Sequence, residues 1–337
     1  MNLQSTLFVL AIFTLSFNLK AQLPTVTLLD SFKNTSIRGL SVVNNKVVWC
    51  SGSNGFVAKS TNGGNSFTKI LVTGYEKRDF RDIEAFDANT AIIMAIAEPA
   101  LLLKTTDGGI HWKKVLEDST KNMFLDALFF ANEKDGVVVG DPINNNFYQA
   151  TTNDGGDTWQ INSHIKALPD EAFFASSGGN VVLQTKSKGN KYWFVSSGAA
   201  SKLYSEEYAN GLLLPITQGS KSTGANAIAL YNNKAIIVGG DFVNPARSDS
   251  NCVLITLGKK LKFSTPEQSP IGYKSSVQFI THSKLVACGT SGIDISSDGG
   301  KHWQQISNES FHVVQKAKHG KLIILAGAKG RIGKLNW

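Results

Sequence analysis

The sequence predicts an all-β fold, specifically a seven-bladed β-propeller built from four-stranded antiparallel blades. Two observations carry this prediction. One glycine-rich turn recurs along the chain at a blade-sized interval, and short alternating apolar segments fill the stretches between the turns. The composition agrees, because 31 glycines against 3 methionines among 337 residues favour turns and strands over long helices.

The recurring turn has the template [Ser/Thr]-x-[Asp/Asn]-x-Gly-x-x-aromatic. It occurs at residues 60–67, 105–112, 152–159 and 296–303. Its defining positions are Asn62, Gly64, Asp107, Gly109, Trp112, Asp154, Gly156, Trp159, Asp298, Gly300 and Trp303. The acidic or amide position repeats after 45 and then 47 residues, and the last interval of 144 residues is three times 48. A period of this length is typical of propellers and solenoids.

The residue types at these positions fit a hairpin turn. The Asp or Asn side chain can accept backbone N–H bonds within the turn, and glycine supplies the positive φ that a side chain disfavours. The aromatic residue begins the next strand, where we expect it to pack between neighbouring sheets. This chemistry is structural, so we expect each motif to link the third and fourth strands of a blade on its outer rim.

Two further blades and the closure of the ring are predicted from the regular spacing of short apolar segments. Residues 172–175, 181–183 and 192–195 are interpreted as the first three strands of blade 4, and residues 227–255 as blade 5, although neither carries the turn. Blade 7 ends with Arg331–Leu335. Its missing fourth strand is predicted to come from Thr25–Leu29, which would join both chain ends in one sheet and remove a free edge.

The N-terminal segment predicts export. An apolar run from Leu7 to Leu15 is followed by the small residue Ala21, which is typical of a signal peptide comprising residues 1–21. Residues 22–337 would then form one propeller domain in the periplasm or outside the cell. The run is short for a membrane span, and we expect no transmembrane segment in the mature chain.

The net charge and the cysteine content limit which partners and cofactors can be expected. The formal net charge is +8, but the basic residues form no dense run and no nucleic-acid motif is present, so we expect no nucleic-acid partner. We expect neither a cofactor nor a metal, because no dinucleotide, haem or metal-ligand motif can be found. We also expect the protein to be a monomer. Cys50, Cys252 and Cys288 are interpreted as buried thiols, with blade 7 separating Cys50 from Cys288.

The four turns resemble the Asp-box, also called the BNR repeat, of sialidases and related propellers. The fuller pattern of residues 289–303 is closest to the photosystem II assembly-factor type of propeller and its exported bacterial relatives. The resemblance implies the fold across the mature chain. It leaves the function open, because such propellers include hydrolases, assembly factors and binding proteins.

The candidate functional site lies on the face opposite the turns. There the loops between second and third strands meet the loops that enter each first strand, around the central channel. These loops contain Arg38, Arg78, Arg81, Asp82, Glu98, Asp141, Lys186, Asn190, Asp241, Arg247, Tyr273, Lys274 and His312. We expect ligand contacts from Arg38, Arg81, Asp82, Lys186, Asn190, Tyr273 and Lys274.

Two functions remain open for this mouth. It could bind an envelope protein, a peptide or an acidic glycan without chemistry, as the assembly-factor resemblance implies. Alternatively, it could cleave an acidic oligosaccharide, with Arg38, Arg81 and Lys274 holding a sugar carboxylate. The acid and base would come from Glu98, Asp141 and Asp241, or His312 would transfer the proton. The Arg-Ile-Pro segment of sialidases is missing, since the nearest text is Ile37-Arg38-Gly39.

Overall fold

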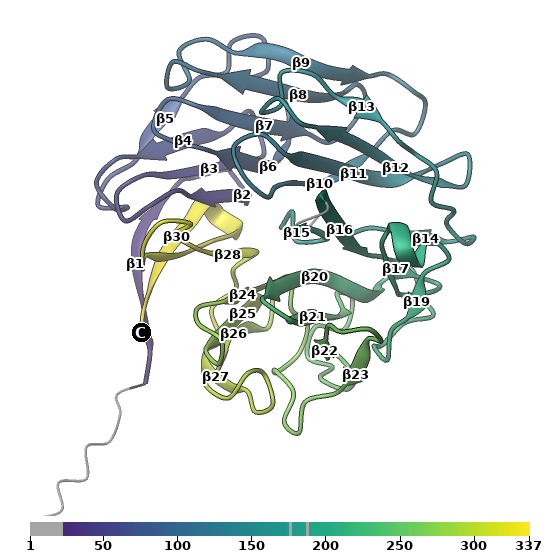
Figure 1. The fold of residues 1–337 in the computed structure, drawn as a ribbon. Helices are drawn as coiled ribbons and strands as arrows, with labels where there is room; N and C mark the ends of the chain where they lie inside the picture. Colours follow the sequence, from purple (N-terminus) through teal and green to yellow (C-terminus); the bar gives the residue numbers. More distant parts are fainter. Residues whose placement is uncertain (1–22, 175–176, 187–188) are drawn as a thin grey trace, which may run out of the picture.

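The computed structural model describes residues 23–174, 177–186 and 189–337, so the predicted signal peptide 1–21 lies outside the described residues. The chain forms a seven-bladed propeller of four-stranded antiparallel blades, as the sequence predicts (Figure 1). The inner strands of successive blades contact one another in order, and the inner strand of blade 7 contacts that of blade 1, so the ring is closed.

The first three blades follow the chain in order. Their strands are β2 (Ile37–Val42), β3 (Val48–Gly52), β4 (Val57–Ser60) and β5 (Thr68–Ile70); β6 (Phe80–Ala85), β7 (Ala91–Ala95), β8 (Ala100–Thr105) and β9 (Lys113–Asp118); and β10 (Leu125–Phe130), β11 (Gly136–Ile143), β12 (Asn146–Thr152) and β13 (Gln160–Ile161).

Blades 4 and 5 lack the turn motif. Their strands are β15 (Val181–Lys186), β16 (Gly189–Val195), β18 (Lys202–Tyr204) and β19 (Leu212–Leu213); and β20 (Thr223–Tyr231), β21 (Lys234–Asp241), β22 (Cys252–Thr256) and β23 (Lys262–Ser264). Two short strands join the inner edge of blade 5, namely β14 (Glu171–Ala172) and β17 (Ser197–Gly198).

The last two blades complete the ring. Their strands are β24 (Ser276–Phe279), β25 (Leu285–Gly289), β26 (Gly292–Ser296) and β27 (Gln304–Ser307); and β28 (Val313–Lys316), β29 (Ile323–Ala326), β30 (Arg331–Asn336) and β1 (Thr25–Ser31). β1 pairs with β30 from Thr25 opposite Asn336 to Ser31 opposite Arg331, which confirms the predicted closure by the N-terminal strand.

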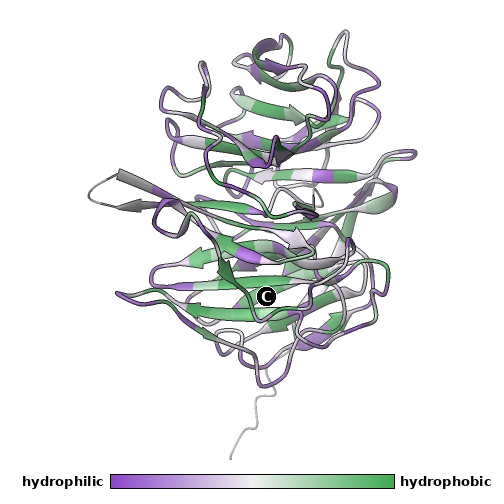
Figure 2. Ribbon diagram, turned by 90° about the vertical axis from the view of Figure 1, so that its right-hand side faces the viewer, coloured by the Kyte–Doolittle hydropathy of each residue, from purple (hydrophilic) through white to green (hydrophobic). Residues whose placement is uncertain are grey.

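Apolar side chains from facing blades form the core. Each interface between blades contains its own cluster of buried residues, and the hydropathy colouring shows apolar strands with polar connections at their ends (Figure 2). Cys50, Cys252 and Cys288 lie in these clusters as buried free thiols, and burial raises the pKa of each.

The four turns share one hydrogen-bond pattern, of which the blade 6 turn is an example. The Ser296 hydroxyl donates to Asp298 Oδ1 at 2.8 Å and accepts from the Gly300 N–H at 3.0 Å. Asp298 Oδ1 also accepts from the His302 N–H at 3.0 Å, and the Trp303 ring N–H donates to Gly300 O at 3.0 Å. Gly300 has a φ of 92°, the left-handed region that glycine tolerates best.

Blade 4 departs from its predicted strand assignment. The predicted second strand, at Val181, is the inner strand β15, and the predicted third strand is the second strand, β16. Residues 172–175 are not its first strand: Glu171–Ala172 pair with β17 instead, and Ala175 lies outside the described residues. Strand rhythm alone could not fix the register, because no turn motif marks the end of this blade.

Blade 4 is held by a buried carboxylate in place of the turn. Glu171 is 3% exposed. Its Oε1 accepts hydrogen bonds from the hydroxyls of Tyr204, at 2.7 Å, and Ser196, while its Oε2 accepts from the Leu168 N–H at 2.8 Å. Glu171 therefore ties the entry segment of the blade to the ends of β16 and β18.

Candidate functional site

Bulges at the start of four inner strands shape the centre of the propeller. The pairing register shifts by one residue in β2, β6, β10 and β20, which leaves Arg38, Arg81, Asp126 and Asn226 as the extra residues. A bulge frees one residue from the ladder and redirects its side chain. Blades 1, 2, 3 and 5 therefore each place one polar residue at the end of the inner strand where the chain enters the blade.

A cavity of about 530 Å³ lies at this end of the channel, and we call it the mouth cavity. Its lining comes from inner strands and from the loops between blades, and it contains five predicted site residues, Arg38, Arg81, Asp141, Tyr273 and His312. The sequence did not single out its other lining residues, which are Phe124, Phe173, Phe174, Phe242, Ser275 and Thr290.

Two arginines give one side of the mouth cavity its positive charge. Arg81 Nε lies 2.8 Å from Asp79 Oδ2, and its guanidinium lies 5.6 Å from the centre of the Phe124 ring. Burial, together with repulsion from Arg81, lowers the pKa of Arg38. Arg38 nevertheless remains charged at neutral pH, because arginine starts from a very high pKa.

His312 is neutral in this environment. Burial and the positive charges of Arg38, Arg331 and Arg81 lower its pKa to about 3. Its imidazole therefore adds hydrogen-bonding capacity to the mouth cavity near pH 7 without adding charge.

Two carboxyl groups lie on the blade 3 side. Asp141 Oδ1 accepts from the Phe173 N–H at 2.9 Å, and burial raises the pKa of Asp141. Beneath it, Asp126 is 1% exposed, and neither of its oxygens makes a hydrogen bond of normal geometry within the described residues. Burial and the charge of Asp141 raise the pKa of Asp126 well above its usual value, opposed in part by Arg81. Asp126 could not be singled out from the sequence, because its bulge depends on strand pairing.

An aromatic wall forms the side contributed by blades 4 to 6. The Phe174 and Phe242 rings meet edge to face at 5.1 Å, and Phe242 lies 6.4 Å from Tyr273. Three apolar side chains on the adjoining loops are exposed to solvent: Phe242 is 46%, Val243 66% and Ile271 48% exposed. Clustered apolar exposure of this kind marks interaction surfaces. The sequence singled out Tyr273 of this wall but not Phe174 or Phe242, because residues 172–175 were interpreted as a strand.

The loops that carry the wall are tied together. The Tyr273 N–H donates to Pro245 O at 2.9 Å, and the Gly272 N–H donates to the Ser248 hydroxyl at 2.8 Å. The buried Asn251 amide donates to Pro270 O at 2.8 Å and to Gly272 O at 2.6 Å. These bonds fix the blade 5 and blade 6 loops relative to each other and preorganise the exposed apolar side chains.

Lys274, for which a ligand contact was expected, does not line the mouth cavity. Its side chain is fully buried and its Nζ lies 2.6 Å from Asp294 Oδ2. The same ammonium donates to Ser291 Oγ at 2.8 Å and to Gly292 O at 3.1 Å. Lys274 is a structural cation of blade 6, paired with a third-strand carboxylate that is distant in the sequence.

Asp82 also lies away from the mouth cavity. It lines a second cavity of about 680 Å³ at the other end of the channel. Its carboxylate accepts from the N–H groups of Ile83, at 2.8 Å, and Leu128, at 2.7 Å, and burial raises its pKa to about 8. Lys186 and Asn190 lie beside the turn of the hairpin that joins β15 and β16. Because β15 and β16 are the first and second strands of blade 4, this hairpin is on the same face of the propeller as the glycine-rich turns and not on the face of the mouth cavity.

Two further candidates, Glu98 and Asp241, form hydrogen bonds within the loops. Glu98 Oε1 accepts from the Asn122 N–H at 2.7 Å, linking blades 2 and 3. Asp241 accepts from the Val243 N–H at 3.0 Å and the Asn244 amide at 3.1 Å. Although burial would raise the pKa of Asp241, hydrogen bonds from Ser222 and these groups lower it. Neither carboxylate lines the mouth cavity.

A short hub segment, Ser177–Gly179, separates the two cavities. The Ser177 hydroxyl donates to Ser275 O of the blade 6 entry at 2.6 Å. Gly178 packs so tightly against Asp82 of blade 2 that a Cβ would lie 2.1 Å from its Oδ2, and Gly179 packs against Ala227 of blade 5. The entry to blade 4 therefore crosses the channel and touches blades 2, 5 and 6.

These features define the class of protein: a seven-bladed β-propeller with a cationic and aromatic mouth. Solved structures share the fold. "YCF48 bound to D1 peptide" aligns with a TM-score of 0.61 at 16% identity, covering 94% of this chain and 97% of that one. The WD40 β-propeller domain of Doa1 aligns with a TM-score of 0.61 at 12% identity, covering 93% and 97%. A GH74 enzyme from Niastella koreensis gives 0.60 at 13% identity, covering 92% of this chain and 53% of that one.

At these identities the likeness extends to the fold alone, and the three proteins differ in what their names describe. No family model matches the chain, and no curated protein matches it by sequence. Within the described residues, no helix has the length and apolar character needed to cross a membrane.

Proposed function

We propose that this protein is an exported binding module that captures a segment of a partner protein in the mouth cavity. The observation that carries the proposal is the combination of two arginines with an aromatic wall around one cavity of about 530 Å³. Peptide recognition commonly combines one or two charged anchors with apolar contacts.

The chemistry of the cavity indicates what the segment contains. An acidic group fits between Arg38 and Arg81, because a negative charge there relieves the repulsion that helps to lower the Arg38 pKa. A neighbouring apolar side chain fits against Phe174 and Phe242. The fold likeness to YCF48, which has been solved with a D1 peptide, supports a peptide ligand for this scaffold.

Cleavage of an acidic glycan receives less support. A glycosidase mechanism needs two carboxyl groups facing the same bond. Among the three predicted acid or base carboxylates, Asp141 alone lines the described mouth cavity, and its neighbour Asp126 is buried beneath it. His312 has a pKa of about 3, so near pH 7 it is a neutral imidazole and not the imidazolium that would act as a general acid.

The proposal can be tested with synthetic peptides in which acidic and aromatic positions are varied independently. We expect the protein without residues 1–21 to prefer peptides that carry both groups close together. The double variant Arg38→Ala/Arg81→Ala should bind such peptides at least about tenfold more weakly, because each charge-assisted hydrogen bond contributes about 1.5–3 kcal/mol.

Lys113→Ala is the matched control, since Lys113 is an exposed cation on the outer strand β9 of blade 2. Its binding should equal that of the parent protein. Equal binding by the double arginine variant, or a preference for peptides without an acidic residue, would remove the mouth cavity as the peptide site.

A further inference from the structure

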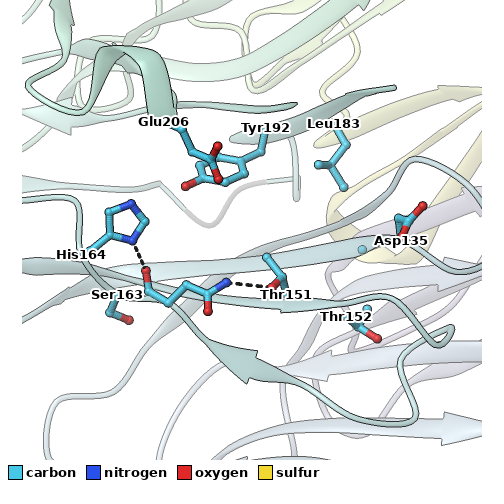
Figure 3. A pocket seen from close by; sticks show the side chains of 10 residues that line it. Asp135, Thr151, Thr152, Ser163, His164, Leu183, Tyr192 and Glu206 are labelled. Atoms are coloured by element: carbon cyan, nitrogen blue, oxygen red, sulfur yellow. Dashed lines mark hydrogen bonds between the residues drawn. The ribbon is translucent and has the colours of Figure 1, made fainter. Parts of the chain in front are cut away.

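A third cavity, also of about 530 Å³, lies between blades 3 and 4, and we call it the interblade groove (Figure 3). Its blade 4 side carries no turn motif. Where the turn is present, it packs on the preceding blade: a Cβ on Gly156 of blade 3 would lie 2.4 Å from Ile92 of blade 2, and one on Gly109 would lie 2.9 Å from Ile70. Blade 4 instead links β18 and β19 through a short 3-10 helix, η1 (Glu206–Tyr208).

Hydroxyl groups on both walls of the interblade groove have protons to donate. Thr151 Oγ1 accepts from the Asn162 amide at 2.8 Å, and Ser163 Oγ accepts from the Gln149 N–H at 3.1 Å. Each hydroxyl can donate as well as accept, so these two bonds leave the O–H of Thr151 and of Ser163 available.

Tyr192 faces these groups from β16 of blade 4 (Figure 3). The residue is 5% exposed, and its buried hydroxyl makes no hydrogen bond of normal geometry within the described residues. Burial raises the pKa of Tyr192, a contact with the Gln149 side chain acts to lower it, and the nearby charge of Glu206 acts to raise it, so the phenol keeps its proton. Because the Tyr192 hydroxyl has no bond of normal geometry within the described residues, a ligand in the groove would provide a better partner.

The interblade groove also contains hydrogen-bond acceptors. His164 Nδ1 lies 2.6 Å from Asn162 O, which can only accept, so the proton of the neutral ring is on Nδ1 and Nε2 presents a lone pair. The carboxylates of Glu206 and Asp135 lie on the blade 4 and blade 3 sides, and the described residues that line the groove include no lysine or arginine.

We propose that the interblade groove binds a neutral oligosaccharide. Sugar hydroxyls both donate and accept, which matches an array of neutral donors interleaved with acceptors. The two carboxylates and the lack of a lining cation disfavour uronic-acid or sulfated sugars, so this site differs in charge from the mouth cavity.

Calorimetric titration with cellotetraose, maltotetraose, xylotetraose and a galacturonic acid tetramer tests the proposal. We expect at least one neutral tetrasaccharide to bind and the galacturonic acid tetramer to bind at least about tenfold more weakly. Tyr192→Phe should weaken the neutral sugar about tenfold by removing one buried hydroxyl. Glu206→Gln, at a side chain exposed on η1, should remove the discrimination against the acidic tetramer.

Two controls separate this site from the rest of the molecule. Tyr148→Phe removes a comparably buried and unpartnered hydroxyl of blade 3 that does not line the groove, and it should bind like the parent protein. Arg38→Ala/Arg81→Ala should leave sugar binding intact even if it abolishes peptide binding. Failure of every neutral sugar to bind, preference for the acidic tetramer, or equal binding by Tyr192→Phe and Tyr148→Phe would each overturn the proposal.

Discussion

Blades 3 and 4 are neighbours in the ring, but they are stabilised in different ways. Blade 3 ends in a turn whose Thr152 and Asp154 side chains bond to residues within four positions and whose Trp159 packs beside Phe130. Blade 4 has no such turn and depends on Glu171, which reaches residues up to 33 positions away. The turn of blade 3 therefore holds its blade through local bonds, whereas Glu171 holds blade 4 through contacts between distant segments. A cavity of about 470 Å³ also borders the turn of blade 2, so a turn does not by itself fill the space between two blades.

The largest expected effect is at a turn aromatic. Trp303→Ala should lower the free energy of unfolding by about 3–5 kcal/mol, because Trp303 is 2% exposed and fills the interface between blades 5 and 6. Urea denaturation followed by circular dichroism measures this loss. Ile110→Ala, at a turn residue that is 75% exposed, should change stability by less than about 0.5 kcal/mol. A loss below 1 kcal/mol for Trp303→Ala would show that the turns do not seal the interfaces.

An intermediate effect is expected at the anchor of blade 4. Glu171→Ala leaves the Tyr204 and Ser196 hydroxyls and the Leu168 N–H without their acceptor, which should cost about 2–3 kcal/mol. Amide hydrogen exchange should accelerate in residues 196–213 more than in blade 6. Glu133→Ala, at an exposed loop position, is the control. Uniform acceleration over all blades would contradict a local role for Glu171.

The smallest effect is expected within the turn itself. Asp298→Asn should cost under about 1 kcal/mol at pH 7, because blade 1 already uses Asn62 at this position with the same Oδ1 bonds. Burial acts to raise the pKa of Asp298, but hydrogen bonds from His302 and Ser296 outweigh it and hold the pKa at about 2.

The pH dependence of this variant follows from that shift. Because the folded pKa is below the usual 3.8, the wild-type carboxylate stabilises the fold above about pH 4, and this contribution is lost as the pH falls toward 2. Asp298→Asn should therefore show a smaller loss of stability over that interval in urea titrations at several pH values. If the variant lost as much unfolding free energy between pH 4 and pH 2 as the wild type, the hydrogen bonds to Asp298 would not be what lowers its pKa.

The parts of the fold that local chemistry dictates could be predicted from the sequence. Asp107, Gly109 and their counterparts specify a turn wherever they occur, and the spacing of the turns gave the seven blades and the closing strand. Blade 4 was assigned one strand out of register because Glu171 acts through tertiary contacts that no spacing reveals.

The site was predicted in part for the same reason. Arg38, Arg81 and His312 were found because loops that enter inner strands must converge at the channel. Lys274 was misassigned because its partner, Asp294, becomes adjacent only in the folded blade. Phe242 was missed because an aromatic residue beside a strand resembles a core residue in sequence.

The hub segment Ser177–Gly179 restricts how a ligand can enter the propeller. Because this segment touches blades 2, 5 and 6, we expect it to obstruct the passage between the mouth cavity and the 680 Å³ cavity. A long polymer would then be unable to thread through the ring and slide. A partner would have to offer a chain end, a loop tip or a single protruding side chain, and it would leave by the side from which it arrived.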